Sequence, residues 1–288
     1  MRRLTMSNKI GISTNIFKNP ANISHVVREI SNNFSIIEIE IEKDFRKALD
    51  NDMDYWNKQI YELAEIKKQK NLYFSLHAPY LGEMTDISSL NNDIRKKAVN
   101  YMIFSIRHSV NLGYKNITIH PGYLYETGTT NKLEYLFDNL CRSLSDITKV
   151  TNDLGGNILL ENTGNNRPRY IVLDNHHYDY LYNEYGIYVT MDIVHYHSFH
   201  HENREDYYHD LEDMIKYVKN AHFNDLRDGK HTHIPLGEGN FQYHQFIEHM
   251  TSKGYQGNFI VEETGVGYSA QNYIDASIKY RDSLYEAA

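Results

Sequence analysis

The feature that most constrains this chain is a repeated alternation of short apolar runs with longer segments of helical period. The runs are rich in Ile, Val and aromatic residues, which is typical of buried strands. The alternation predicts βα units arranged around a parallel sheet. Eight strands are expected, at 9–13, 36–41, 73–77, 116–120, 157–162, 187–192, 218–223 and 258–262.

The clearest of the intervening helices are expected at 94–112 and 133–154, where apolar residues recur at helical spacing. Gly113, Gly186 and Gly254 stand where C-terminal helix caps belong. These signals place helices between the strands and support the βα interpretation.

Eight strands, each followed by a helix, within 288 residues match a (β/α)8 TIM barrel of the α/β class. A doubly wound sheet is the alternative, but it would place a Gly-rich phosphate-binding turn after the first strand. Residues 11–15 read Gly-Ile-Ser-Thr-Asn, and neither GxGxxG nor GxxxxGK[ST] occurs. We therefore expect one barrel domain over 1–288, with 1–8 as an extended or disordered N-terminus, and no nucleotide cofactor.

Composition narrows the functional classes. The net charge of −8 and the pI of about 6.0 show no overall excess of the positive charge that a dedicated nucleic-acid-binding protein carries. Cys141, the one cysteine, cannot form an intrachain disulfide, and residues 1–4 lead into no apolar leader segment. No apolar run approaches the ~20 residues of a membrane span. These features predict a cytoplasmic protein that does not insert into membranes.

Potential metal ligands occur at the predicted ends of six strands and in the loop after the seventh. This matters because the active site of a parallel barrel lies at the C-terminal ends of its strands. The residues are His77, His120, Glu161, Asp192, His195, His222, His231, His233 and Glu262. Imidazole and carboxylate groups suit zinc, manganese, iron and cobalt. Because unpaired buried charges are costly, their convergence predicts a divalent metal site.

The histidine-rich run 195–201 directly follows the sixth predicted strand. The histidines after His195, which are His197, His200 and His201, follow the strand closely enough to contact a substrate, but they are expected to be ordinary loop residues. His197 and His200 therefore receive no functional role from the sequence.

The strand-end residues occur in recognisable motifs. They are His77-Ala-Pro-Tyr80, His120-Pro-Gly, Glu161-Asn-Thr, Asp192-x-x-His195, His222-x-Asn-Asp225, His233 before Leu-Gly-Glu-Gly, and Glu262. In order and spacing they resemble the xylose isomerase-like barrel superfamily, over the third to eighth strands. That superfamily contains sugar-phosphate isomerases and epimerases, and also the endonuclease IV group of abasic-site (AP) endonucleases.

Resemblance to the isomerase and epimerase branch implies one divalent metal held by Glu161, Asp192, His222 and Glu262. It also implies that Glu161 and Glu262 flank the substrate and act as the acid and base that move a proton next to a carbonyl. A metal suits this reaction because it polarises the carbonyl oxygen while a carboxylate accepts the proton. In this branch His195 is expected to contact the substrate.

Resemblance to the endonuclease IV branch implies a cluster of three zinc ions that activates water against a phosphodiester. The additional ligands would be His77, His120, His195, His231 and His233. The sequence departs from that pattern because His231 stands where the repair enzymes have Asp. The pair Tyr80-Leu81, in contrast, matches residues that the repair enzymes insert into DNA.

We therefore expect a metal-dependent isomerase or epimerase that acts on a sugar, a sugar phosphate or a polyol. Arg227 is predicted to contact a substrate hydroxyl or phosphate, and Tyr80 to line the pocket. The alternative is a zinc-dependent phosphodiesterase, for which DNA would be the partner. A barrel that has lost catalysis is disfavoured because the four core ligands are present. Superfamily members are often oligomeric, so a homo-oligomer is compatible with the resemblance.

Overall fold

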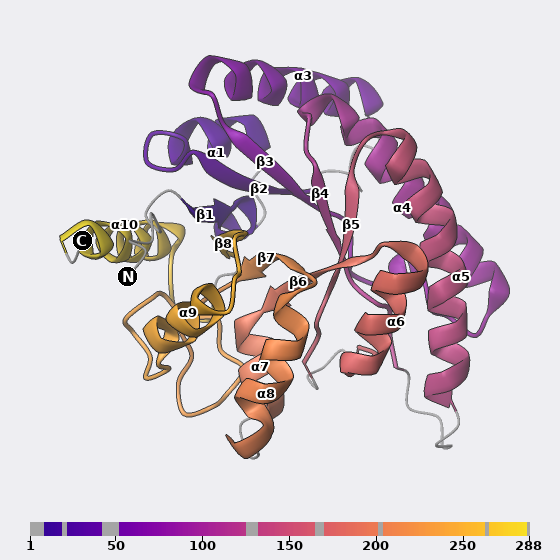
Figure 1. The fold of residues 1–288 in the computed structure, drawn as a ribbon. Coiled ribbons are helices and arrows are strands. Elements are labelled where there is room, and N and C mark those ends of the chain that lie inside the picture. Colours follow the sequence, from indigo (N-terminus) through magenta and orange to yellow (C-terminus); the bar gives the residue numbers. More distant parts are fainter. Residues whose placement is uncertain are drawn as a thin grey trace.

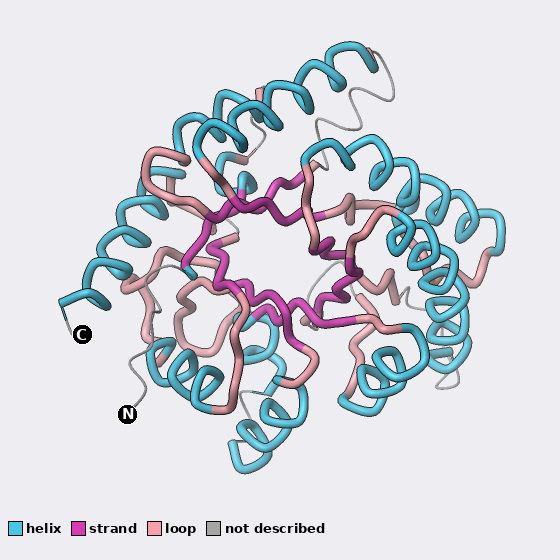
Figure 2. Tube along the Cα trace, turned by 45° about the horizontal axis from the view of Figure 1, so that its top comes forward, coloured by secondary structure: helices cyan, strands magenta, loops and turns pink. Residues whose placement is uncertain are grey.

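Eight parallel strands form a closed barrel in which each strand neighbours the next along the chain, from β1 to β8. The computed structural model describes residues 9–18, 22–41, 52–124, 132–164, 170–200, 204–262 and 265–286. Figure 2 shows the ring of strands enclosed by helices. The predicted (β/α)8 barrel is therefore confirmed, whereas the expected N-terminal segment 1–8 lies outside the described residues.

The strands coincide with the predicted ones to within one residue at each end. They are β1 (Ile10–Ser13), β2 (Ile36–Glu40), β3 (Tyr73–His77), β4 (Asn116–Ile119), β5 (Asn157–Glu161), β6 (Tyr188–Asp192), β7 (Val218–His222) and β8 (Asn258–Val261). Because all eight run in the same direction, their C-terminal ends meet at one rim of the barrel. The motifs identified in the sequence therefore lie at a common edge.

The helices surround the barrel in chain order (Figure 1). They are α1 (Ile23–Ile30), α3 (Met53–Lys70), α4 (Asn92–Ser109), α5 (Lys132–Asp153), α6 (Asn175–Tyr185), α7 (Ile193–His200), α8 (Arg204–Ile215), α9 (Tyr243–Ser252) and α10 (Ala270–Glu286). The described residues also include the short 3-10 helices η2 (Thr14–Phe17), η3 (Glu83–Thr85) and η4 (Val110–Leu112). Among the described residues, no helix is both long enough and apolar enough to cross a membrane.

The two clearest predicted helices are present. The segment 94–112 corresponds to α4 continued by η4, and 133–154 corresponds to α5. Gly113 caps η4 and Gly186 caps α6, both in the left-handed conformation that glycine adopts without steric cost. Gly254 follows Lys253, the C-cap of α9.

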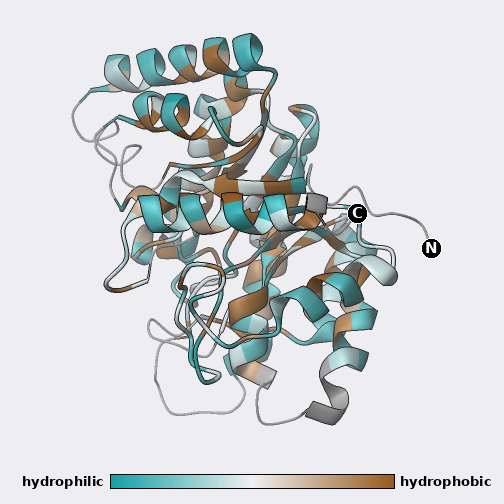
Figure 3. Cartoon of the chain, turned by 90° about the vertical axis from the view of Figure 1, so that its left-hand side faces the viewer, coloured by the Kyte–Doolittle hydropathy of each residue, from teal (hydrophilic) through white to brown (hydrophobic). Residues whose placement is uncertain are grey.

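The apolar core lies between the outside of the barrel and the helices. Trp56 and Leu63 of α3, and Leu140 and Leu144 of α5, are each 0% exposed. Figure 3 shows the hydrophobic strands at the centre and hydrophilic residues along the outer helices. Burial of this apolar surface is the main force that holds the helices against the sheet.

The segment after β6 is a helix, so the expectation of a loop at His197 and His200 is wrong, and His201 lies outside the described residues. Asp192 ends β6, and its Oδ1 accepts the backbone N–H of His195 at 2.6 Å, as an N-cap residue does. That hydrogen bond satisfies a donor of the first turn, so α7 begins immediately after the strand. Its first turn places His195 at the rim of the barrel.

Candidate metal centre

Six ionisable side chains converge at the C-terminal rim of the barrel. Four of them end strands, and two lie one residue beyond a strand. All six are buried, with at most 8% of the residue exposed. They are His77 of β3, His120 after β4, Glu161 of β5, Asp192 of β6, His222 of β7 and Glu262 after β8. The described structure thus brings together side chains that are far apart in the sequence.

Glu161 is at the centre of this group. Its Oε2 lies 3.1 Å from the Nε2 of both His77 and His120, and 3.6 Å from the Nδ1 of His222. Its Oε1 lies 3.4 Å from the Nδ1 of His195. Burial by itself would raise the pKa of Glu161, but His120 and His222 hold it well below its usual range. The carboxylate is therefore ionised among four imidazoles.

Glu262 approaches the same histidines from the other side of the rim. It lies 3.3 Å from the Nδ1 of His222 and 3.5 Å from the Nε2 of His77. Burial raises its pKa, yet His222 draws it down to about 2. Ligand atoms of His77, Glu161, His222 and Glu262 all lie within 4.8 Å of one another, which is close enough for one ion to contact all four.

Asp192 belongs to two overlapping groups within the same distance limit. One contains Glu161 and His195, and the other contains His233 and Glu262. The isomerase resemblance implied four ligands. Three of them, Glu161, His222 and Glu262, share one group with His77. The fourth, Asp192, lies in the two neighbouring groups. The rim offers more than one arrangement of ligands.

Backbone carbonyls orient two of the imidazoles. The Nδ1 of His77 donates to the carbonyl of Ala78, and the Nδ1 of His195 donates to the carbonyl of Asn162, each at 3.0 Å. In a neutral imidazole, a proton on Nδ1 leaves the lone pair on Nε2. Both rings can therefore present Nε2 as a ligand atom.

The donor set fits a divalent cation. Glu161 Oε1, His120 Nδ1 and both ring nitrogens of His222 are buried without an aligned hydrogen-bond partner, although charged neighbours lie close. A buried polar atom left in this state costs about 1–3 kcal/mol. A cation shared by carboxylate oxygens and imidazole nitrogens would satisfy several of these atoms, and the mixture of ligands suits zinc, manganese, iron or cobalt.

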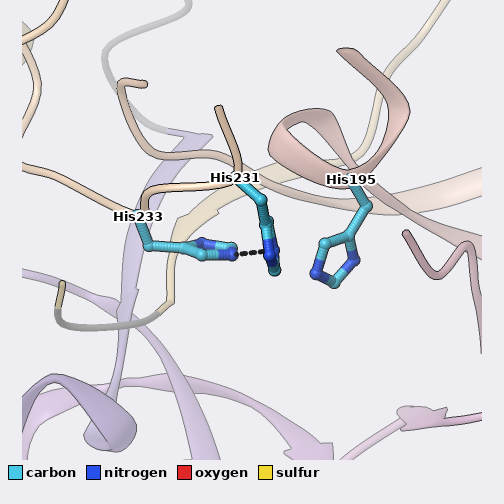
Figure 4. A group of neighbouring side chains, drawn as sticks. All are labelled: His195, His231 and His233. Carbon is cyan, nitrogen blue, oxygen red and sulfur yellow. Dashed lines mark hydrogen bonds between the residues drawn. The ribbon is translucent and has the colours of Figure 1, made fainter. Parts of the chain in front are cut away.

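A second group consists only of histidines. His195, His231 and His233 present nitrogens within 4.8 Å of one another, and the Nε2 atoms of His231 and His233 are 2.8 Å apart. Figure 4 shows His231 between the other two rings. Burial lowers the pKa of His231 to about 2, helped by His233 and His195, so its imidazole is neutral. Neutral imidazoles are the form that binds a metal.

The loop that carries His231 and His233 is folded around Asp225. The Asp225 carboxylate accepts backbone N–H groups from Leu226 at 2.8 Å, Gly237 and Gly239 at 3.0 Å, and Phe241 at 3.2 Å. A Cβ atom at Gly239 would lie 2.2 Å from the carbonyl oxygen of Leu226, so only glycine fits there. The motif Leu-Gly-Glu-Gly is therefore the part of the loop that closes on Asp225.

The two predicted substrate residues outside the ligand groups lie in different surroundings. Tyr80 is half-buried; its ring stacks on His120 at a centroid distance of 4.5 Å and meets His77 edge-on at 5.1 Å. Arg227 is exposed, and its guanidinium donates to the carbonyl of Glu238 in its own loop at 2.5 Å. Tyr80 therefore adjoins the centre, whereas Arg227 braces the neighbouring loop.

Two residues that support the centre received no role from the sequence. Asn162 joins the ends of β5 and β6, because its Oδ1 accepts from the backbone N–H of Asp192 at 2.6 Å and its Nδ2 donates back to the Asp192 carbonyl at 3.0 Å. Glu38 lies below the rim, 2.9 Å from the Nε2 of His222. Its position in a strand of alternating Ile and Glu was the available signal.

Comparison with known proteins decides the family. A family model described as xylose isomerase-like TIM barrel matches residues 27–284. The chain belongs to this family. The resemblance inferred from the strand-end motifs is thereby confirmed.

Similar proteins match this chain at low sequence identity. An uncharacterized protein of Methanocaldococcus jannaschii is 24% identical over 262 residues, which cover 90% of this chain and 84% of that protein. A crystal structure of a D-tagatose 3-epimerase-like protein matches with a TM-score of 0.77 and 21% identity over 97% of each chain. D-psicose 3-epimerase from Clostridium cellulolyticum matches with a TM-score of 0.76 and 16% identity, covering 96% of this chain and 98% of that one.

The Asp225→Asn substitution tests how the histidine loop is held. We expect it to lower the free energy of unfolding by about 1–3 kcal/mol, because an amide cannot accept all the N–H groups that face the carboxylate. Amide hydrogen exchange should accelerate over 225–241. Asp228→Asn is the matched control, since Asp228 is exposed in the same loop and should change stability by less than about 0.5 kcal/mol. Equal effects of the two substitutions would contradict the role of Asp225.

Metal affinity should depend on pH. Burial by itself would lower the pKa of His222, but Glu262, Glu38 and Glu161 raise it well above its usual range. Without metal, this imidazole is therefore protonated on both nitrogens at neutral pH, and a metal that binds its Nδ1 must displace a proton. Affinity should rise with pH up to the raised pKa, by about tenfold per pH unit for each proton released. Competition with a chelator between about pH 6 and 8 measures this; a pH-independent affinity would contradict it.

Proposed function

We propose that this protein is a divalent-metal-dependent isomerase or epimerase of a sugar, a sugar phosphate or a related polyhydroxy compound. The observation that carries the proposal is the placement of two buried carboxylates, Glu161 and Glu262, around the Nδ1 of His222 at the barrel rim. Two ionised carboxylates beside one ligand nitrogen provide both a metal site and a pair of proton carriers. The proposed metal ligands are Glu161, Asp192, His222 and Glu262.

The proposed chemistry is proton transfer at a carbon next to a carbonyl. When bound, a divalent metal supplies a positive charge that polarises the substrate oxygens and stabilises the enediolate-like transition state. The chain supplies the acid and the base. One of the two glutamates, as the carboxylate, removes the proton. The same group can return that proton to the adjacent carbon, or the other glutamate, after taking up a proton from solvent, can deliver it to the original carbon from the opposite face. Neighbouring histidines hold the pKa of both glutamates low, so each begins as a proton acceptor.

Other residues would bind and orient the substrate. His195 and Tyr80 adjoin the ligand groups, and Arg227 lies in the loop beyond β7. Similar solved structures are described as acting on small sugars, D-psicose 3-epimerase among them. These names support a carbohydrate-like substrate for this chain. We also propose that 1–288 forms one domain, in keeping with the span of the family match.

A second candidate function is a zinc-dependent phosphodiesterase of the endonuclease IV kind. The observation that favours it is the three-histidine group beside the carboxylate groups, which gives the rim enough ligands for more than one metal ion. DNA would then be the partner. The net charge of −8 does not favour binding to a polyanion, which needs cations to displace its counterions.

The Glu161→Gln substitution tests the proposed function. Gln has nearly the size of Glu, so the fold should persist, but it cannot carry the proton. We expect the exchange of substrate hydrogen with solvent deuterium, screened over ketoses and inososes, to slow by about 10²–10⁴-fold. Glu184→Gln, at an exposed position of α6, is the matched control and should leave exchange unchanged. Undiminished exchange in Glu161→Gln would contradict the assignment.

Metal content per chain separates the two candidates. For the isomerase we expect about one divalent ion per chain by elemental mass spectrometry, on protein purified without chelator or an affinity-tag metal. His120→Ala should then retain near-normal metal, because His120 is not among the proposed ligands. Two or three zinc ions per chain, with a large loss of metal in His120→Ala and cleavage of abasic DNA, would instead establish the phosphodiesterase.

A further inference from the structure

The interior of the barrel below the metal centre is polar. Glu38, Ser75, Thr118, Thr190 and Asn220 are each at most 1% exposed. Two of their hydrogen bonds join strands that are not neighbours in the sheet, so these two cross the inside of the barrel. Asn220 of β7 donates to Glu38 of β2, and the hydroxyl groups of Thr118 and Thr190 are 2.8 Å apart between β4 and β6. Barrel interiors are ordinarily filled by branched apolar residues.

Glu38 connects this polar layer to the metal centre. Its Oε2 accepts hydrogen bonds from the hydroxyl of Ser75 and the side-chain amide of Asn220, each at 3.1 Å. Its Oε1 lies 2.9 Å from the Nε2 of His222. The two groups are close enough to attract each other by charge when the imidazole is protonated, although neither atom has an aligned hydrogen-bond partner. Two donors therefore fix one carboxylate oxygen while the other faces the imidazole.

Position and burial argue that Glu38 has a purpose other than stability. A carboxylate that is 0% exposed loses its hydration, and apolar residues of similar volume in its place are often neutral or stabilising. The contacts of the other ring nitrogen of His222 indicate why a carboxylate is buried at this position. Its Nδ1 faces Glu161 at 3.6 Å and Glu262 at 3.3 Å, so the ring lies between Glu38 below and the candidate ligands above.

We propose that Glu38 is a positioning residue that holds the His222 ring with Nδ1 directed into the metal centre. A proton kept on Nε2 by Glu38 leaves the Nδ1 lone pair available as a ligand. A carboxylate behind a metal-binding imidazole also fixes the ring orientation and increases its basicity, and its loss weakens metal affinity about 10–100-fold. This inference rests on the proposed function, because it assumes that His222 binds a metal.

The test compares zinc affinities of variants, measured by competition with a chromogenic chelator. We expect Glu38→Gln to weaken zinc binding by about 10–100-fold. Glu38→Asp should weaken it too, because the shorter side chain keeps the charge but retracts it from His222. Thr190→Val is the matched control: it perturbs the same buried layer without touching His222 and should retain wild-type affinity.

A double-mutant cycle shows whether Glu38 acts through His222. In the His222→Ala background, Glu38→Gln should cause little further loss of zinc affinity, because the ring that Glu38 positions is absent. Unfolding temperatures of the metal-free variants report the separate effect on stability. If Glu38→Gln does not fold, Ser75→Ala removes only one of the two donors to Glu38 and should give a smaller loss of affinity in the same direction.

The zinc affinities of the Glu38 variants distinguish a positioning role from the alternatives. Wild-type affinity in both Glu38 variants, or the full loss repeated in the His222→Ala background, would overturn the positioning role and leave the proposed function standing. Loss in Glu38→Gln with wild-type affinity in Glu38→Asp would also overturn it, because charge and not position would then be the cause. A wild-type protein that binds no divalent metal would overturn both the proposed function and this inference.

Discussion

Charge balance around Glu161 is the constraint on which the candidate metal centre depends. This carboxylate is 1% exposed and has four imidazole nitrogens between 3.1 and 3.6 Å from its oxygens. A buried carboxylate without compensating positive charge would be prohibitively costly, so either protonated histidines or a cation must be present. Protons and metal ions therefore compete for the same side chains. The elements around the barrel rim bring this compensation to one point.

Support for the centre comes from groups that never reach the reacting space. Asn162 ties the ends of β5 and β6 together, Asp225 gathers the loop that carries His231 and His233, and Glu38 lies behind His222. Asn162 and Asp225 accept hydrogen bonds from backbone N–H groups, whereas Glu38 places a carboxylate oxygen beside a ring nitrogen of His222. Rigid support of this kind holds the candidate ligands in a fixed arrangement, as metal sites in proteins generally require.

Most of the fold was predictable because its signals are local. Every strand lies within one residue of its predicted bounds, since apolar runs and the helices between them follow short-range periodicity. The helix α7 was not predicted, because its run of histidines and aromatics has no amphipathic period and its start depends on Asp192 as a cap. Glu38 received no role for a related reason: a carboxylate in an alternating strand also fits an ordinary half-exposed strand.

The sequence by itself determined the fold class, the family and the set of ionisable residues at the strand ends. Barrel closure decided how those residues combine. It placed His77 with Glu161, His222 and Glu262, turned Asp192 toward the adjoining groups, and set Asn220 of β7 opposite Glu38 of β2. The physical reason is that contacts across a barrel depend on the stagger and twist of strands that are not neighbours, which local periodicity does not encode.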